Sequence, residues 1–196
     1  MVRYAKRLSR ARAAAFAAVL WVAITSPASA SGQPARPQAT AAEARMLLVA
    51  REIMRAARFG TFITRDHTGA TSARTVDPIL PDSSFVIRFA TNPRSRKVRE
   101  IARERRVTLF YFDAATLGYV SLSGTARVLI DSAAKSRHWK KDWEPFYPDR
   151  ERDVVIIEVI PTRLEVVSVK EGITGDSVTW AAPAVRNFRR PRGDRR

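Results

Sequence analysis

The sequence contains no cysteine, and this absence removes several classes of chemistry at once. It excludes disulfides, thiolate metal sites and a cysteine nucleophile. Histidine is nearly as scarce, because only His67 and His138 occur among the 196 residues. We therefore expect no metal site. No constellation of acid, base and nucleophile is visible either, so no catalytic side chain is assigned.

Acidic residues are also in short supply. There are 19 against 35 basic residues, which gives a net charge of +16. Such an excess suggests a nucleic-acid or membrane surface, but its distribution argues against a dedicated groove. The first thirty residues hold five cations and no acid, and six arginines lie between positions 186 and 196. We expect a basic surface and tail, and no specific nucleic-acid partner.

Residues 13–24 form an apolar run of twelve residues, which is too short to span a bilayer comfortably. A basic start precedes the run, and small residues at Ala28 and Ala30 follow it, as in an export signal with a cleavage site. We predict a signal peptide over residues 1–30, an exported protein without a stable membrane span, and a linker over residues 31–39. The alternative is an unused signal and a cytoplasmic protein.

Periodicity predicts an α+β domain over residues 40–170. Thr40 and Glu43 have the spacing of a capping box and begin a helix of about four turns. Further helices are expected from Ser95 to near Arg106 and over residues 132–143. About seven short strands are expected, over residues 60–64, 70–76, 85–91, 107–112, 119–130, 153–160 and 163–169, with Pro161 as a break between the last two. Many short strands joined by turns indicate a sandwich or a barrel.

After Gly172 the pattern is typical of loops, and we expect a basic, partly disordered tail over residues 171–196. Gly124, in the middle of a long strand, indicates a bulge or a close backbone approach. An aromatic cluster that includes Trp139, Trp143, Phe146 and Tyr147 forms either a binding wall or a plug on the end of the barrel.

One stretch carries a candidate site. A strand ends at Thr91, a turn follows at Asn92-Pro93, and Ser95-Arg96-Lys97 begin a helix. The first amides of a helix lack internal partners, and the helix dipole adds partial positive charge there. A hydroxyl and two cations at such a corner suit a phosphate. The alternative is a capped, solvated helix start that happens to be basic.

The order of these elements resembles the pyridoxamine 5′-phosphate oxidase-like family, especially its general stress protein branch. Thr91-Asn92, then Ser95-Arg96-Lys97, an aromatic strand and the run Tyr119 to Ala126 carry the resemblance, and the stretch Trp139 to Pro148 adds to it. It implies a six- to seven-stranded split β-barrel. It also implies a homodimer with FMN at the interface.

The same resemblance assigns the cofactor-binding residues. Arg74, Arg96 and Lys97 match cations that reach the flavin phosphate, with Ser95 beside them. Thr75 and Val76 match positions along the ring edge, Ala90 and Thr91 match a backbone pair near the flavin, and Tyr119 matches a position that reaches the ring from the other subunit. Within the family, deazaflavin (F420) and haem are the alternative cofactors.

Two departures from the family pattern narrow the function. The C-terminal arginine and histidine with which the oxidase grips the pyridoxal ring are missing, so oxidation of vitamin B6 is not expected. Gly118 replaces a basic residue that often precedes the Tyr-Val-Ser run. The sequence therefore indicates an FMN-dependent oxidoreductase acting on a small molecule of unknown identity. The alternatives are a flavin-binding stress protein without turnover, and a protein that binds anionic polymers through its arginine tail.

Overall fold

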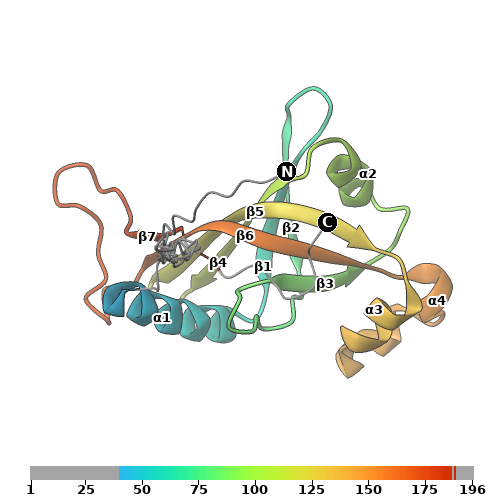
Figure 1. The fold of residues 1–196 in the computed structure, drawn as a ribbon, viewed down its shortest axis with the longest axis horizontal. Helices are drawn as coiled ribbons and strands as arrows, with labels where there is room; N and C mark the ends of the chain where they lie inside the picture. The colour runs from blue at the N-terminus through green and yellow to red at the C-terminus, as the bar shows by residue number, and fades with distance from the viewer. Residues whose placement is uncertain (1–39, 187, 189–196) are drawn as a thin grey trace, which may run out of the picture. The chain divides into compact units, whose positions relative to one another are not determined.

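Seven antiparallel strands form the central sheet, with helices across one face and at one end (Figure 1). The computed structural model describes residues 40–186 and residue 188. The strands are β1 (Gly60–Arg65), β2 (Thr71–Val76), β3 (Ile87–Thr91), β4 (Arg106–Asp113), β5 (Gly118–Leu129), β6 (Val155–Val167) and β7 (Ala184–Val185). Their order is β2-β1-β4-β5-β6-β3, and β7 pairs with β6. The expected α+β class and barrel-type sheet are confirmed.

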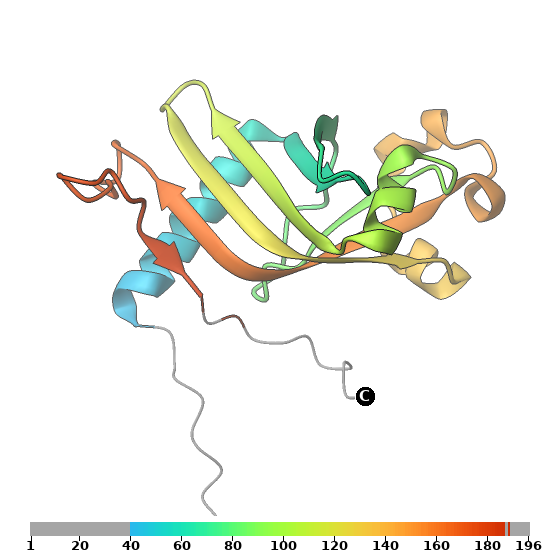
Figure 2. The same ribbon diagram turned by 90° about the horizontal axis from the view of Figure 1, so that it is seen from above.

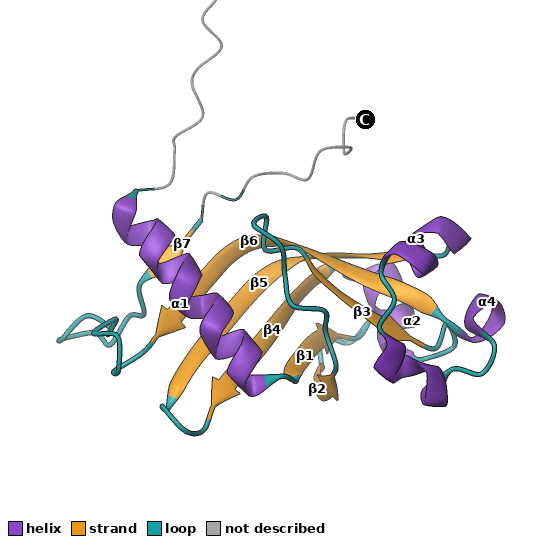
Figure 3. Cartoon of the chain, turned by 90° about the horizontal axis from the view of Figure 1, so that it is seen from below, coloured by secondary structure: helices purple, strands orange, loops and turns teal. Residues whose placement is uncertain are grey.

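Helix α1 (Ala41–Ala57) lies across the sheet (Figure 3). The predicted capping box is present, with the Thr40 side chain accepting from the Glu43 amide and the Glu43 carboxylate accepting from the Thr40 amide. Val49, Ala50, Ile53 and Met54 form the buried stripe of the helix. This stripe packs on the buried faces of β4 and β5 and closes the core.

Strand β6 corrects one expectation, because Pro161 does not break it. A proline lacks the amide that a sheet ladder needs, so it is tolerated where the ladder is interrupted. Pro161 pairs with Gly124, and the register of β5 and β6 shifts between Ser123 and Gly124. A Cβ built on Gly124 would lie 2.5 Å from the Ile160 carbonyl oxygen. The glycine permits this close approach, and the bulge accommodates the proline within one strand.

The helices after β3 are shorter than expected. Helix α2 (Arg96–Arg103) ends before Arg106, because Arg106 already pairs with Thr125 in the sheet. The helix expected over residues 132–143 divides into α3 (Ser132–Arg137) and a 3-10 segment, η1 (Lys141–Phe146). A further short helix, α4 (Arg150–Asp153), was not predicted. Segments α3, η1 and α4 lie together near one end of the sheet, beyond the end of β5 and the start of β6 (Figures 1 and 3).

Strand β7 was also not predicted, although Val185 is fully buried and pairs with Leu164. A two-residue strand carries almost no periodic signal, so only its partner reveals it. The predicted signal peptide and linker lie outside the described residues, as does most of the arginine tail. Among the described residues, no helix is long and apolar enough to cross a membrane.

Candidate functional site

The corner between β3 and α2 is built by local hydrogen bonds. The Asn92 side chain accepts from the Arg94 amide at 2.8 Å, and the Ser95 amide donates to the Asn92 carbonyl at 3.1 Å. These bonds turn the chain sharply after β3. Ser95 occupies the cap position of α2, but its side chain makes no capping bond. Its hydroxyl oxygen lies 3.5 Å from Thr91 Oγ1 instead. Two hydroxyls therefore face each other at the corner.

Lys97 completes this group. Its ammonium donates to Thr91 Oγ1 at 2.9 Å, and the side chain is half-buried. Burial lowers the pKa of Lys97, the charge of Arg74 lowers it further, and Glu100 opposes the shift. A partly desolvated ammonium beside another cation gains from an incoming anion. The corner is therefore electrostatically prepared for a phosphate.

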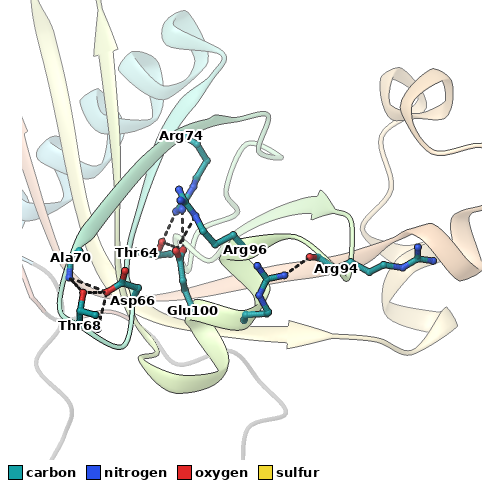
Figure 4. A network of polar contacts seen from close by, with 9 residues as sticks. Thr64, Asp66, Thr68, Ala70, Arg74, Arg94, Arg96 and Glu100 are labelled. Carbon is teal, nitrogen blue, oxygen red and sulfur yellow. Dashed lines mark hydrogen bonds and ion pairs between the residues drawn. The ribbon is translucent and has the colours of Figure 1, made fainter.

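Arg74 and Arg96 converge on a buried carboxylate, that of Glu100 (Figure 4). Arg74 donates to Glu100 Oε2 at 2.9 Å, and the Thr64 hydroxyl donates to the same oxygen at 2.5 Å. Arg96 Nε lies 3.2 Å from Glu100 Oε1, which is an ion pair without hydrogen-bond geometry. Three cations and one carboxylate leave two net positive charges at the corner.

Beside the corner is a pocket of about 350 Å³. Five predicted residues from three separate segments line it together: Thr75 and Val76 from β2, Ala90 and Thr91 from β3, and Lys97 from α2. Its remaining lining residues are Arg58, Phe59, Asp77, Asp142, Trp143, Phe146 and Tyr147. The pocket thus joins strand backbone, aromatic side chains and a cation, and its volume suits a small organic ligand.

Segment η1 supplies the aromatic wall of this pocket. The Trp143 indole donates to Asp77 Oδ2 at 2.9 Å, and the Lys140 ammonium donates to Asp77 Oδ1 at 2.6 Å. The Tyr147 hydroxyl donates to the Ala90 carbonyl at 3.3 Å, and burial raises the pKa of Tyr147. The cluster therefore packs against the barrel and lines the pocket at the same time. The sequence analysis treated a binding wall and a plug on the end of the barrel as alternatives, but residues of this cluster do both.

Comparison with models of protein families shows to which family the chain belongs. The family model described as "Pyridoxamine 5'-phosphate oxidase like" matches residues 48–182. The chain belongs to this family. No curated protein matches the sequence.

Solved structures share the fold. One is a protein related to general stress protein 26 from Clostridium acetobutylicum, with 16% identity and a TM-score of 0.61 over 72% of this chain and 94% of that one. Another is the general stress protein 26 from Bacillus anthracis, with 20% identity and a TM-score of 0.53 over 60% of this chain and 90% of that one. A heme binding protein from Mycobacterium smegmatis has 18% identity and a TM-score of 0.53, over 70% of this chain and 56% of that one.

The residues present fit the flavin of this flavin-binding superfamily. Phosphate requires cations and hydroxyls, and the corner offers Lys97 and Ser95, each within hydrogen-bonding range of the Thr91 hydroxyl. A flat, largely apolar ring requires aromatic and strand neighbours, and the adjoining pocket offers both. The two requirements are met side by side.

The structure separates the other predicted residues from this pocket. Arg74 and Arg96 do not line it and are held by Glu100 instead, although Arg74 is close enough to influence the pKa of Lys97. Tyr119 lies on the face of β5 opposite to the core, with its ring 5.6 Å from that of Phe110. The role assigned to Tyr119 requires a second subunit and stays a prediction.

Sequence reasoning missed Arg58, Asp77 and Glu100. Arg58 lines the pocket from a strained backbone position, with φ at 58°, just after α1. The sequence indicated only a turn residue at Asp77, because Pro78 follows it. Its hydrogen bonds to Lys140 and Trp143 span more than sixty residues and leave no local signal. Glu100 gave one usable signal, since it stands four residues after Arg96 on the same helix face.

Proposed function

We propose that this chain is an FMN-binding oxidoreductase. The observation that carries the proposal is the pocket, where five residues that the family resemblance assigns to the flavin meet an aromatic wall beside a doubly positive corner. A flavin monophosphate has the matching features, a dianionic phosphate and a flat apolar ring. The fold likeness of relatives below 25% identity supplies the architecture and not the cofactor.

In this proposal the side chains bind and orient. Lys97, Ser95 and Thr91 hold the phosphate, while Arg74 adds charge from behind and Glu100 keeps Arg74 in place. Val76, Ala90 and Trp143 border the ring and exclude water from it. A bound flavin would supply the hydride-transfer chemistry, for which the protein needs no acid, base or nucleophile. The substrate would be a small molecule.

We also propose the homodimer and the export that the sequence indicates. A partner subunit would bring its Tyr119 side chain to the flavin, and residues 1–30 would direct the chain out of the cell. The dimer is tested by the mass of the protein in light scattering. Export is tested by mass spectrometry of the secreted or periplasmic product, which should begin at Ser31. A product that retains Met1 would contradict it.

The cofactor proposal is tested on the purified protein by its visible spectrum and by the mass of the released cofactor. We expect FMN, a weaker complex in Lys97→Ala, and a smaller loss in Arg96→Ala, because Arg96 does not line the pocket. Reduction by a nicotinamide donor and reoxidation by an acceptor would support an enzyme. A bound flavin that no donor reduces would indicate a binding protein, and a bound deazaflavin or haem would replace FMN.

A further inference from the structure

A second cavity, of about 300 Å³, lies between the C-terminal part of α1 and the connection from β2 to β3. Met54, Pro78, Ile79, Leu80 and Pro81 give it apolar walls, and Tyr111 lines it from β4. Apart from Arg58, no residue of this lining also lines the flavin pocket. An apolar cavity of about 150 Å³ holds a benzene molecule, so this one has room for a substituted ring.

Among the residues that line the cavity, Tyr111 is the one with a buried polar side-chain group. The side chain is 2% exposed, and its hydroxyl has no hydrogen-bond partner among the described residues. An unpaired buried hydroxyl costs about 1–3 kcal/mol, which a bound acceptor would recover. Burial also raises the pKa of Tyr111 far above the physiological range. The phenol therefore remains a neutral donor.

Cations stand around the rest of the lining. Lys140 is bound to Asp77, and Arg58 lies 3.8 Å from Asp142. Arg55 is exposed, and its guanidinium makes no hydrogen bond or ion pair with the described residues. The lining therefore combines apolar walls, a buried donor and a cation able to attract a carboxylate, and the ligand it fits must present the complementary groups.

We propose that this cavity is a second small-molecule site, which binds an aromatic or similarly apolar carboxylate with an acceptor oxygen at its far end. The carboxylate meets Arg55, the ring packs between Met54 and Leu80, and the acceptor oxygen receives a hydrogen bond from the Tyr111 hydroxyl. The site does not depend on the proposed flavin, because its distinguishing residues lie outside the flavin pocket.

Three matched probes test the two polar contacts by calorimetric titration. 4-Acetylbenzoate carries both the carboxylate and an acceptor, 4-ethylbenzoate lacks the acceptor, and 4-ethylacetophenone lacks the charge. We expect 4-acetylbenzoate to bind about five-fold more tightly than 4-ethylbenzoate, as one neutral hydrogen bond provides. Equal affinities, or no binding by any probe, would overturn the proposal.

Two variants connect the preference to the residues. Tyr111→Phe should abolish the preference for the acetyl group, whereas Tyr119→Phe on the opposite face of the sheet should retain it. Arg55→Gln should lower the preference for 4-acetylbenzoate over 4-ethylacetophenone, whereas Arg51→Gln, outside the cavity, should not. A preference that survives in Tyr111→Phe would refute the assignment of the donor.

Thermal unfolding of the ligand-free protein gives a second readout. Removing an unpaired buried hydroxyl should leave stability unchanged or raise it, so Tyr111→Phe should unfold at the same or a higher temperature. A clear loss of stability, together with no binding of the probes, would mean that an ordered water satisfies the hydroxyl and that the cavity is a hydration site. Retention of FMN is measured in the same samples and should not change in Tyr111→Phe, which separates this site from the flavin.

Discussion

Glu100 determines the charge of the phosphate corner, although it is buried and lies among basic residues. It accepts from Arg74 and Thr64 and pairs with Arg96, which aligns two cations that would otherwise repel each other. The same negative charge opposes an incoming phosphate. Glu100 is therefore expected to stabilise the free protein and to weaken the binding of the phosphate, and both effects can be measured.

Glu100→Gln is expected to separate the two effects. The amide retains a hydrogen-bond acceptor but leaves the largely buried Arg74 without its counterion, so stability should fall by about 2 kcal/mol. The corner gains one net positive charge, so FMN should bind more tightly. Urea unfolding and flavin fluorescence titration measure the two quantities.

Glu104→Gln is the matched control for that change. Glu104 is half-buried and bonded just after the same helix to Arg106, whose side chain is 81% exposed, so removing its charge should alter stability by less than about 1 kcal/mol. If Glu100→Gln weakened FMN binding, the carboxylate would have to organise the site more than it repels the ligand. That result would reverse our interpretation of the corner.

Lys97 predicts the pH dependence of binding. Its pKa is lowered in the free protein, and a bound phosphate would favour the charged form and raise that pKa again. Affinity should be full while Lys97 is protonated in the free protein and should fall as pH rises through the lowered pKa. Titrations between pH 7 and 10 should therefore show an alkaline decline. Lys97→Arg should remove it, because a guanidinium stays charged throughout this range, and a decline of equal slope in this variant would refute the assignment.

At the scale of elements, local signals predicted most of the fold. The capping box, the hairpin and the alternating strands depend on neighbours within a few residues, so the sequence alone was sufficient to place them. Three features depend on distant partners: strand β7, the end of α3 at Arg137 where a longer helix was expected, and the continuity of β6 through Pro161. The site divides in the same way, because Lys97 and Thr91 lie within one motif while Asp77 acts on η1 across the fold.

The bulge at Gly124 is the element on which β6 depends. A Cβ at this position would meet the Ile160 carbonyl oxygen at 2.5 Å and Val159 Cγ1 at 2.8 Å, and the backbone atom cannot move aside cheaply. Gly124→Ala should therefore destabilise the protein by about 3 kcal/mol. Gly118→Ala is the control, since its nearest contact is the mobile end of the Ile53 side chain at 3.1 Å. Equal midpoints for the two variants in denaturant unfolding would contradict this reasoning.

Asp77 anchors the aromatic wall to the barrel. It is the acceptor for both Lys140 and Trp143, so Asp77→Ala should release η1 while leaving the sheet intact. We expect about a ten-fold loss of FMN affinity, changed tryptophan fluorescence and far-ultraviolet circular dichroism like that of the parent. Asp142→Ala on the same segment should have little effect on fluorescence or dichroism, since its side chain is 67% exposed. Unchanged affinity in Asp77→Ala would remove the wall from the flavin site.

At the scale of the whole molecule, the two faces of the sheet differ in what covers them. Helix α1 packs on the buried face of β4 and β5 (Figures 2 and 3), whereas the opposite face carries Phe110, Phe112 and Tyr119 at half-buried or exposed positions. Phe112 is 49% exposed, and the rings of Phe110 and Tyr119 pair at 5.6 Å. Aromatic residues on an open sheet face are typical of a protein interface. A second copy of this chain is the partner that the family resemblance indicates.

A charge at Phe112 tests this dimer and its connection to the cofactor. The full chain of 196 residues, of 22.0 kDa, should have twice that mass in light scattering, and Phe112→Asp should reduce it to one chain because an interface centre does not tolerate an unpaired charge. FMN should dissociate in the same variant, since Tyr119 of the partner subunit would no longer reach the ring. Leu48→Asp is the control, because it also replaces an exposed apolar side chain, 65% exposed on α1, with a charge. This variant should remain dimeric and keep the flavin. A monomer that binds FMN as tightly as the parent would show that each chain builds its site alone.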